Sequence, residues 1–253
     1  MDYIYETHMH TSEASRCAKK PAAEGVAHMI SKGYKGVIVT DHFHNGSTCV
    51  DRNLPWNEWV DGYCKGYENA KKAAEDTDLS VFFGVEFNFQ GDEYLLYGID
   101  KEWLLSHPQM LEYSRKELFE EVDKAGGLMI HAHPYRERYY IFEIFLSPEN
   151  CHGVEIYNAQ NPSYQNALAY RYAKKYKLPM SSGSDIHFKT EEVLGGVRCS
   201  RPLKDIHDFV QAFKNGELTP VSIRSDGTVV DVESLVEECE VSKEAKCPII
   251  YAE

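Results

Sequence analysis

The 253-residue sequence lacks several features that identify common classes of protein. Its seven cysteines are scattered, odd in number and without a C-x-x-C pair, which disfavours a disulfide framework or a zinc ribbon and indicates reduced thiols. No apolar run approaches the ~20 residues of a membrane-spanning helix, and no basic and then apolar signal region opens the chain. We therefore expect a cytoplasmic protein with no membrane partner.

Basic residues are also in the minority, with 27 Lys and Arg against 40 Asp and Glu and a net charge of −13. Phosphate backbones are held by clustered Lys and Arg, so this balance argues against long nucleic acids and anionic membranes as partners. It leaves room for a small phosphorylated substrate at a metal site, because bound cations supply local positive charge.

Three common catalytic motifs are missing: the nucleophile elbow, the P-loop and the G-x-G-x-x-G dinucleotide fingerprint. What the sequence does contain is an alternation of strand and helix patterns. Buried strands are predicted at 36–40, 79–85, 128–130 and 179–182, and helices at 21–32, 112–125 and 203–214. Such alternation indicates parallel pairing, in either a doubly wound sheet or a closed barrel. We expect one domain over residues 1–225 and a C-terminal appendage of unknown role over 226–253.

The first strand pattern ends in His8-Met9-His10. Side chains alternate along a strand, so the two imidazoles point the same way, with their Cα atoms about 7 Å apart. Neutral imidazole is a ligand that suits Zn, Fe, Mn or Ni. An isolated H-x-H is as often surface chemistry of no consequence, but here the later strands end in the same kinds of residue.

Potential metal ligands follow five of the predicted strands: His8 and His10, then Asp41 and His42, Glu86, His131 and His133, and finally Asp185 and His187. An open sheet would spread five such ends over roughly 20 Å, too far for one metal cluster. A closed barrel gathers them onto one face. We therefore predict an α/β fold of the TIM-like barrel type.

In order, the motifs H-M-H, T-D-H, G-V-E, H-A-H-P and G-S-D-I-H resemble those of the PHP family, the polymerase and histidinol phosphatase domain. The resemblance covers roughly residues 1–224. It implies a distorted seven-stranded (β/α)7 barrel and a phosphoesterase site with two or three divalent ions, which would be Zn, Mn or Fe, with Mg possible.

The resemblance also implies roles for individual residues. It suggests that His8, His10 and Asp185 bind one metal, that Glu86 bridges two, that His133 serves the second, and that His42 and His187 serve a third.

Two positions depart from the family pattern. The family usually has a histidine shortly after the glutamate strand, where Glu93 is the nearest substitute and would favour Mn or Mg. The third metal often takes a further His or Asp after H-x-H. This chain offers Glu13, Ser15, Arg16 and Cys17 there, and Glu13 is our candidate.

Alternatives stay open for three further residues. Asp41 either orients an imidazole or caps the following loop, and Glu155 is either a contact of the site or a chance polar position. Arg136 either binds a substrate phosphate through its guanidinium or forms a salt bridge with Glu137 or Glu143.

For the reaction, we expect in-line attack on a phosphate ester by metal-activated hydroxide, without a covalent enzyme intermediate. Glu86 would bridge the ions, and His131, His187 or a bound water would protonate the leaving oxygen. The leading interpretation is a small-molecule phosphomonoesterase, acting on a histidinol-phosphate- or nucleotide-type substrate. The alternatives are a phosphodiesterase or exonuclease on short oligonucleotides and a non-catalytic metal-binding barrel.

Overall fold

The computed structural model describes residues 2–188, 193–237, 239 and 244–252. Its main strands are β1 (Tyr3–Met9), β2 (Gly36–Val39), β3 (Ser80–Asn88), β4 (Glu93–Tyr97), β5 (Leu128–Ala132), β7 (Gly153–Asn158), β8 (Met180–Gly183), β9 (Leu194–Cys199), β10 (Thr219–Ile223) and β11 (Val229–Asp231). The helices are α1 (Ala22–Ser31), α2 (Trp56–Tyr63), α3 (Lys65–Ala73), α4 (Lys101–Ser106), α5 (Arg115–Lys124), α6 (Ser163–Tyr176), α7 (Ile206–Lys214), α8 (Val232–Glu237) and a 3-10 helix, η1 (Pro108–Glu112). A short second sheet pairs β6 (Ile144–Leu146) with β12 (Ile249–Tyr251).

The prediction of a closed seven-stranded barrel is wrong. The strands form one ten-stranded mixed sheet, curled into a half-barrel, in the order β11-β10-β9-β1-β2-β3-β4-β5-β7-β8. The connection from β3 to β4 is only residues 89–92, which is too short for a parallel crossover, so β4 runs antiparallel to β3. It is antiparallel to β5 as well. β9 is likewise antiparallel to β1 and β10. These reversed strands replace the regular strand–helix repeat that a (β/α)7 barrel requires.

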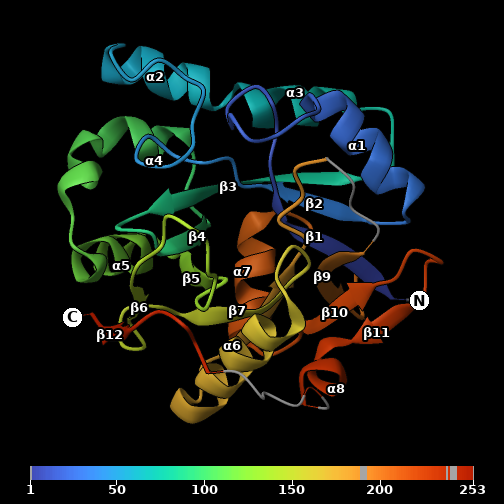
Figure 1. The fold of residues 1–253 in the computed structure, drawn as a ribbon. Coiled ribbons are helices and arrows are strands. Elements are labelled where there is room, and N and C mark those ends of the chain that lie inside the picture. The colour runs from blue at the N-terminus through green and yellow to red at the C-terminus, as the bar shows by residue number, and fades with distance from the viewer. Residues whose placement is uncertain (1, 189–192, 238, 240–243, 253) are drawn as a thin grey trace.

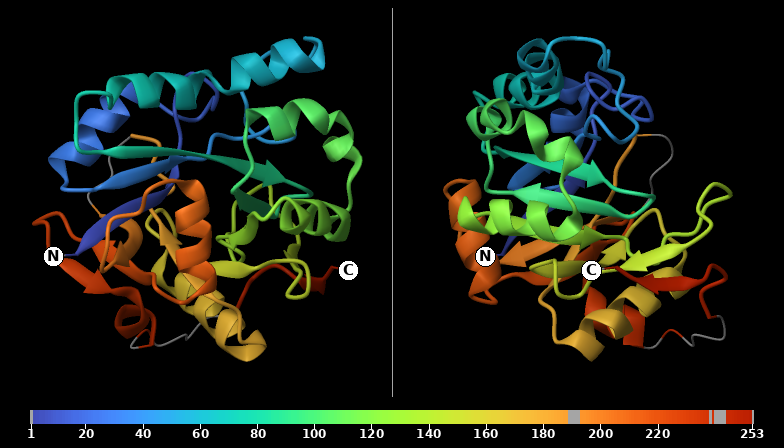
Figure 2. Two further views of the ribbon diagram at one scale, coloured as in Figure 1. Left: turned by 180° about the vertical axis from the view of Figure 1, so that it is seen from behind. Right: turned by 90° about the vertical axis from the view of Figure 1, so that its left-hand side faces the viewer.

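Helix α7 packs against the inner side of the curled sheet (Figure 1). Its Phe209, Val210 and Phe213 share a buried cluster with Tyr5 at the start of β1 and Ile130 in β5. Helices α1 and α3 pack against each other and cover the outer side of β2 and β3, while α6 covers β7 (Figures 1 and 2). This packing fixes the strands so that their C-terminal ends remain available for polar side chains.

After β8 the chain returns to β1. The backbone nitrogen of His10 donates to the carbonyl oxygen of Ile186, and the nitrogen of Ile186 donates to that of His8, each at 3.2 Å. These two bonds set the segment with Asp185 and His187 directly beside the H-x-H segment. The curled sheet therefore gathers strand ends without a closed barrel.

The described residues after 226 lie against the rest of the molecule. β11 pairs with β10, α8 packs on α6 and β10, and β12 pairs in parallel with β6. The division at residue 225 stays a prediction. Among the described residues, no helix is both long and apolar enough to span a membrane.

Candidate metal centre

The end of β1 directs two buried imidazoles into one space. Nδ1 of His8 lies 2.9 Å from Oε1 of Glu155, and because a carboxylate only accepts, this nitrogen carries the hydrogen. Nδ1 of His10 lies 3.1 Å from the hydroxyl of Ser15, whose own hydrogen goes to Asp41 at 2.6 Å. The neutral rings thereby present the lone pairs of their Nε2 atoms to the site.

Two fully buried carboxylates face these nitrogens. Oε1 of Glu86 lies 3.1 Å from Nε2 of His8, and Oδ1 of Asp185 lies 3.2 Å from Nε2 of His10. Within the described part of the chain, no hydrogen bond is made to either Nε2 atom or to Oδ1 of Asp185. Lone pairs and anionic oxygens this close repel one another unless positive charge lies between them. The arrangement therefore fits a divalent cation.

The pKa shifts of His8 and Glu86 likewise indicate that the cluster favours a positive charge at its centre. Burial lowers the pKa of His8, but Glu155, Asp185 and Glu86 together raise it well above its ordinary value. Burial raises the pKa of Glu86, whereas His42 and His8 hold it well below its usual range. Ionised carboxylates and a positive partner thus stabilise each other in this cluster, whether a proton or a metal ion supplies the charge.

Glu86 lies between two groups of imidazoles. Its Oε1 is 3.1 Å from Nε2 of His133, and its Oε2 is 2.5 Å from Nδ1 of His42. Glu93 lies beside the same two imidazoles. Its Oε2 is 3.5 Å from Nε2 of His133 and its Oε1 is 3.6 Å from Nδ1 of His42. One oxygen of Glu86 thus faces His8 and His133 while the other faces His42, an arrangement that suits a carboxylate shared by two cations.

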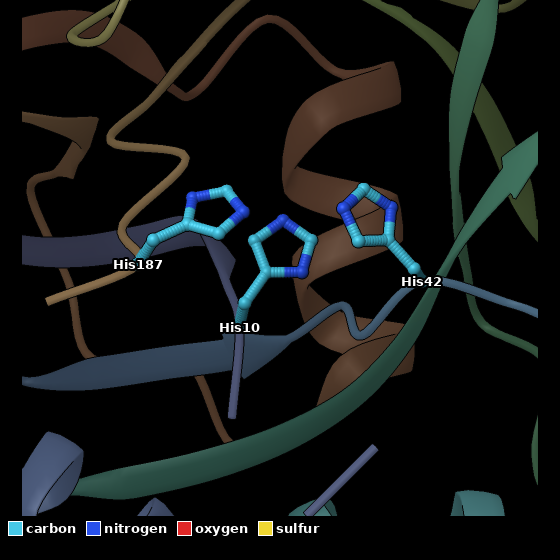
Figure 3. A group of neighbouring side chains, drawn as sticks. All are labelled: His10, His42 and His187. Carbon is cyan, nitrogen blue, oxygen red and sulfur yellow. The ribbon is translucent and has the colours of Figure 1, made fainter. Parts of the chain in front are cut away.

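A third group consists of His10, His42 and His187, and each ring turns a nitrogen toward the space between them (Figure 3). The ring of His10 lies 4.4 Å from each of the other two. Nδ1 of His187 donates to the backbone oxygen of Asp185 at 2.8 Å, which leaves its Nε2 facing Sγ of Cys17 at 3.1 Å. Burial raises the pKa of Cys17, but its hydrogen bonds with His187 and His42 bring it down to about 6.

Two sequence candidates lie outside this cluster. The Glu13 carboxylate accepts hydrogen bonds from the backbone nitrogen of Ala22, at the start of α1, and from Asn69. His131 is fully buried and stacks on Tyr94, with ring centroids 4.5 Å apart, and burial lowers its pKa to about 3. Glu13 is engaged at the start of α1 and His131 packs on Tyr94, so we retain neither in the site.

Arg136 forms neither of the salt bridges considered from the sequence. Its Nη1 lies 2.8 Å from Oδ2 of Asp185 and 3.0 Å from Nε2 of His133. The side chain is 14% exposed, so the guanidinium lies at the rim of the cluster. The structure thus brings Arg136 beside the candidate ligands, and its contact with a phosphate stays a proposal.

Supporting residues explain why the imidazoles point inward. Glu155 accepts from His8, from the backbone nitrogen of His133 and from Asn158, the last two at 3.0 Å. A Cβ atom at Gly183 would lie 2.6 Å from Oε1 of Glu155, so β8 needs glycine there to let that carboxylate through. The charge inside the β7 pattern was the one sequence signal for Glu155, and no local pattern indicates Asn158.

Asp41 orients an imidazole, as the first alternative held, but its carboxylate caps the loop after β1 rather than the loop that follows Asp41. It accepts from the backbone nitrogen of Thr11 at 2.6 Å, which fixes the loop after β1. Through Ser15 it also fixes the ring of His10. No local sequence pattern connects Ser15 with Asp41 or His10, because these contacts depend on how the loop folds back.

Comparisons with known proteins agree with these observations. The sequence model of a family described as PHP-associated matches residues 163–218. The fold is similar to that of a two-domain protein from Bacteroides vulgatus that contains a predicted PHP-like metal-dependent phosphoesterase. The TM-score is 0.62 and the identity 16%, over 96% of this chain and 73% of the other. Over residues 163–218 the chain is therefore similar to the PHP-associated family, and the structural similarity shows a shared fold.

A second structural comparison concerns the fold alone. It resembles an amidohydrolase from Chromobacterium violaceum, solved with bound sulfate and no metal, with a TM-score of 0.53 and 15% identity over 90% of this chain and 99% of the other. No curated protein matches the chain significantly.

Proposed function

We propose that this protein is a metal-dependent hydrolase of phosphate esters of the PHP type, and that its substrate is a small phosphomonoester of the histidinol-phosphate or nucleotide type. The observation that carries the proposal is the position of Glu86, which is fully buried with Oε1 at 3.1 Å from Nε2 of His8 and of His133 and with Oε2 at 2.5 Å from Nδ1 of His42. The similarity to a protein containing a PHP-like phosphoesterase supports the same reaction class.

The donor set fits two or three divalent ions. Imidazole nitrogens suit Zn, Mn and Fe, whereas carboxylates such as Glu93 also suit Mg. The residues that would hold them are His8, His10 and Asp185 on one side, His133, Glu93 and His42 on the other, and Glu86 between. When bound, such ions lower the pKa of water to supply a nucleophile and neutralise the charge that develops on phosphoryl oxygens.

The chain's own residues then position the reactants. Glu155 and the Asp41–Ser15 pair hold His8 and His10 in the tautomers whose Nε2 atoms face the site. Arg136, at the rim, presents a planar guanidinium that can hold two phosphate oxygens and so orient the ester. His131 has no part in this proposal, because it faces Tyr94 rather than the cluster.

The test is hydrolysis of a nitrophenyl phosphate monoester and of the matching diester, each with added Mn²⁺ or Zn²⁺ and again after chelation. We expect metal-dependent cleavage of the monoester alone. Cleavage of the diester instead would favour a phosphodiesterase on short oligonucleotides. Metal binding without cleavage of either ester would contradict phosphatase activity and favour a non-catalytic metal-binding protein.

Arg136→Lys tests the contact with substrate more specifically, because lysine keeps the positive charge but lacks the planar guanidinium that can hold two phosphate oxygens. We expect KM for the monoester to rise while the metal content stays the same. An unchanged KM would remove Arg136 from the proposal.

A further inference from the structure

Cys17 stands out among the residues around the site, because it is not one of the residues that the sequence resemblance assigned. Its Sγ lies 3.1 Å from Nε2 of His187, whose ring centroid lies 6.0 Å from that of His42. The ring of His10, fully buried and without a donor on Nε2 among the described residues, faces the same space (Figure 3).

We propose that Cys17 is a metal ligand, and that its thiolate, with His42 and His187, forms a site for a soft divalent ion such as zinc. The inference rests on the metal centre of the proposed function but not on the identity of its substrate. Three protein ligands leave a fourth position open, which is the composition of a zinc site that can also bind water or a substrate oxygen.

The three ligands come from separate segments that the fold holds in place. Cys17 lies in the loop after β1, where the backbone nitrogen of Arg16 donates to Ser47 at 2.8 Å and that of Lys19 donates to His187 at 3.0 Å. His187 is oriented by its bond to the backbone of Asp185. The thiol is therefore positioned by backbone contacts on both sides of it.

The distances suit a shared ion. With bonds of about 2.0 Å to nitrogen and about 2.3 Å to sulfur, a tetrahedral zinc site separates its N and S ligands by about 3.5 Å. Sγ of Cys17 and Nε2 of His187 are 3.1 Å apart, so a small outward movement of the two side chains accommodates the ion. On binding, the thiol releases its proton to solvent and acts as a thiolate.

A Cys17 thiolate would affect which metal ion the site prefers. A thiolate favours Zn over Mg and Mn, whereas Glu93 on the other side of the cluster favours the harder ions. We therefore expect the Cys17 site to retain Zn²⁺ under conditions that remove Mg²⁺ and Mn²⁺.

Cobalt substitution tests this ligand directly. We would load wild type, Cys17→Ser and Cys49→Ser with Co²⁺ and record the near-ultraviolet thiolate-to-cobalt charge-transfer band. Cys49 is a matched control, because it is an exposed thiol whose Sγ lies 3.6 Å from the backbone oxygen of Ser12 and 3.3 Å from that of Glu13. We expect the band in wild type and Cys49→Ser, its loss in Cys17→Ser, and about tenfold weaker zinc retention in that variant.

A second measurement needs no variant. The rate of Cys17 alkylation, followed by peptide mass spectrometry in wild type, should fall on addition of Zn²⁺ but not of Mg²⁺. A band that persists in Cys17→Ser, or an alkylation rate that zinc leaves unchanged, would overturn the assignment. A Cys17-dependent band in a protein that cleaves no phosphate ester would support this inference and contradict the proposed function, so the two can fail separately.

Discussion

The H-A-H-P segment places two histidines, only two residues apart, in opposite surroundings. His133 lies among Glu86, Glu93 and Arg136, at the end of the strand. His131 lies behind β5, stacked on Tyr94, and its two ring nitrogens have no hydrogen-bond partner among the described residues. One is a candidate metal ligand, and the other is part of the packing between the sheet and its outer layer.

Backbone geometry accounts for the difference. Ile130 and Ala132 both belong to the inner cluster that packs with α7, so alternation along β5 sends His131 to the outer side. The same alternation would send His133 outward too. Its φ of +30° ends the strand and turns the side chain inward. A motif spacing therefore identifies a ligand only when the backbone between its residues is known.

The largest effect should come from the shared carboxylate. Glu86→Gln keeps the shape but removes the charge between the two imidazole groups, so we expect hydrolysis of a phosphate monoester to fall by about a thousandfold, with loss of bound metal. Metal analysis and rate measurements on the same preparation check this. Near-wild-type turnover in the variant would show that Glu86 is not at the centre of the site.

The comparison between the two histidines gives a matched pair of variants. We expect His133→Phe to lose at least one ion per chain and most of its activity, because a ligand is removed. His131→Phe should keep its bound ions and its activity, because phenylalanine can stack on Tyr94 as the imidazole does. Equal loss in the two variants would refute the distinction between the inner and outer histidine.

A smaller effect is expected for Glu155→Gln. The amide oxygen can still accept the hydrogen of His8 Nδ1, but it lacks the negative charge that makes the imidazole a stronger ligand. We expect metal affinity to fall by about tenfold, measured by competition with a chromogenic chelator. An unchanged affinity would mean that Glu155 contributes packing and not ligand orientation.

The smallest effect concerns stability at acid pH. Folded His131, with a pKa of about 3, stays neutral while the unfolded chain takes up a proton below about pH 6.5. The unfolded state thus binds more protons between these values, and the free energy of unfolding falls as the pH falls, by at most about 1.4 kcal/mol per pH unit from this residue. Urea unfolding should therefore show a shallower decline for His131→Phe than for wild type. Parallel curves would contradict this explanation.

The sequence alone predicts which potential ligands lie close together, because they follow strand ends that meet at one edge of the sheet. His8, His10, His42, Glu86, Glu93, His133, Asp185 and His187 all lie in the cluster. The closed barrel failed because a hydrophobic pattern does not encode strand direction. Only the short connection of residues 89–92 hinted that β4 reverses.

Individual ligands depend on contacts that no local pattern contains. Glu13 was the expected third-site ligand, but the start of α1 satisfies its carboxylate. Cys17, four residues later, reaches His187 across 170 positions of sequence. Their distance in sequence from the H-x-H motif places Glu13 and Cys17 equally near the metal centre. The conformation of the loop determines that Cys17 faces it and Glu13 does not.

The most direct test of the account is a metal titration of the stripped protein while hydrolysis of nitrophenyl phosphate is followed. We predict no turnover in the stripped protein, and activity that returns and reaches a plateau once at least two equivalents of Mn²⁺ or Zn²⁺ are bound. Hydrolysis that survives complete removal of metal, or a stripped protein that binds no divalent ion, would contradict the assignment of the strand-end cluster as a catalytic metal centre.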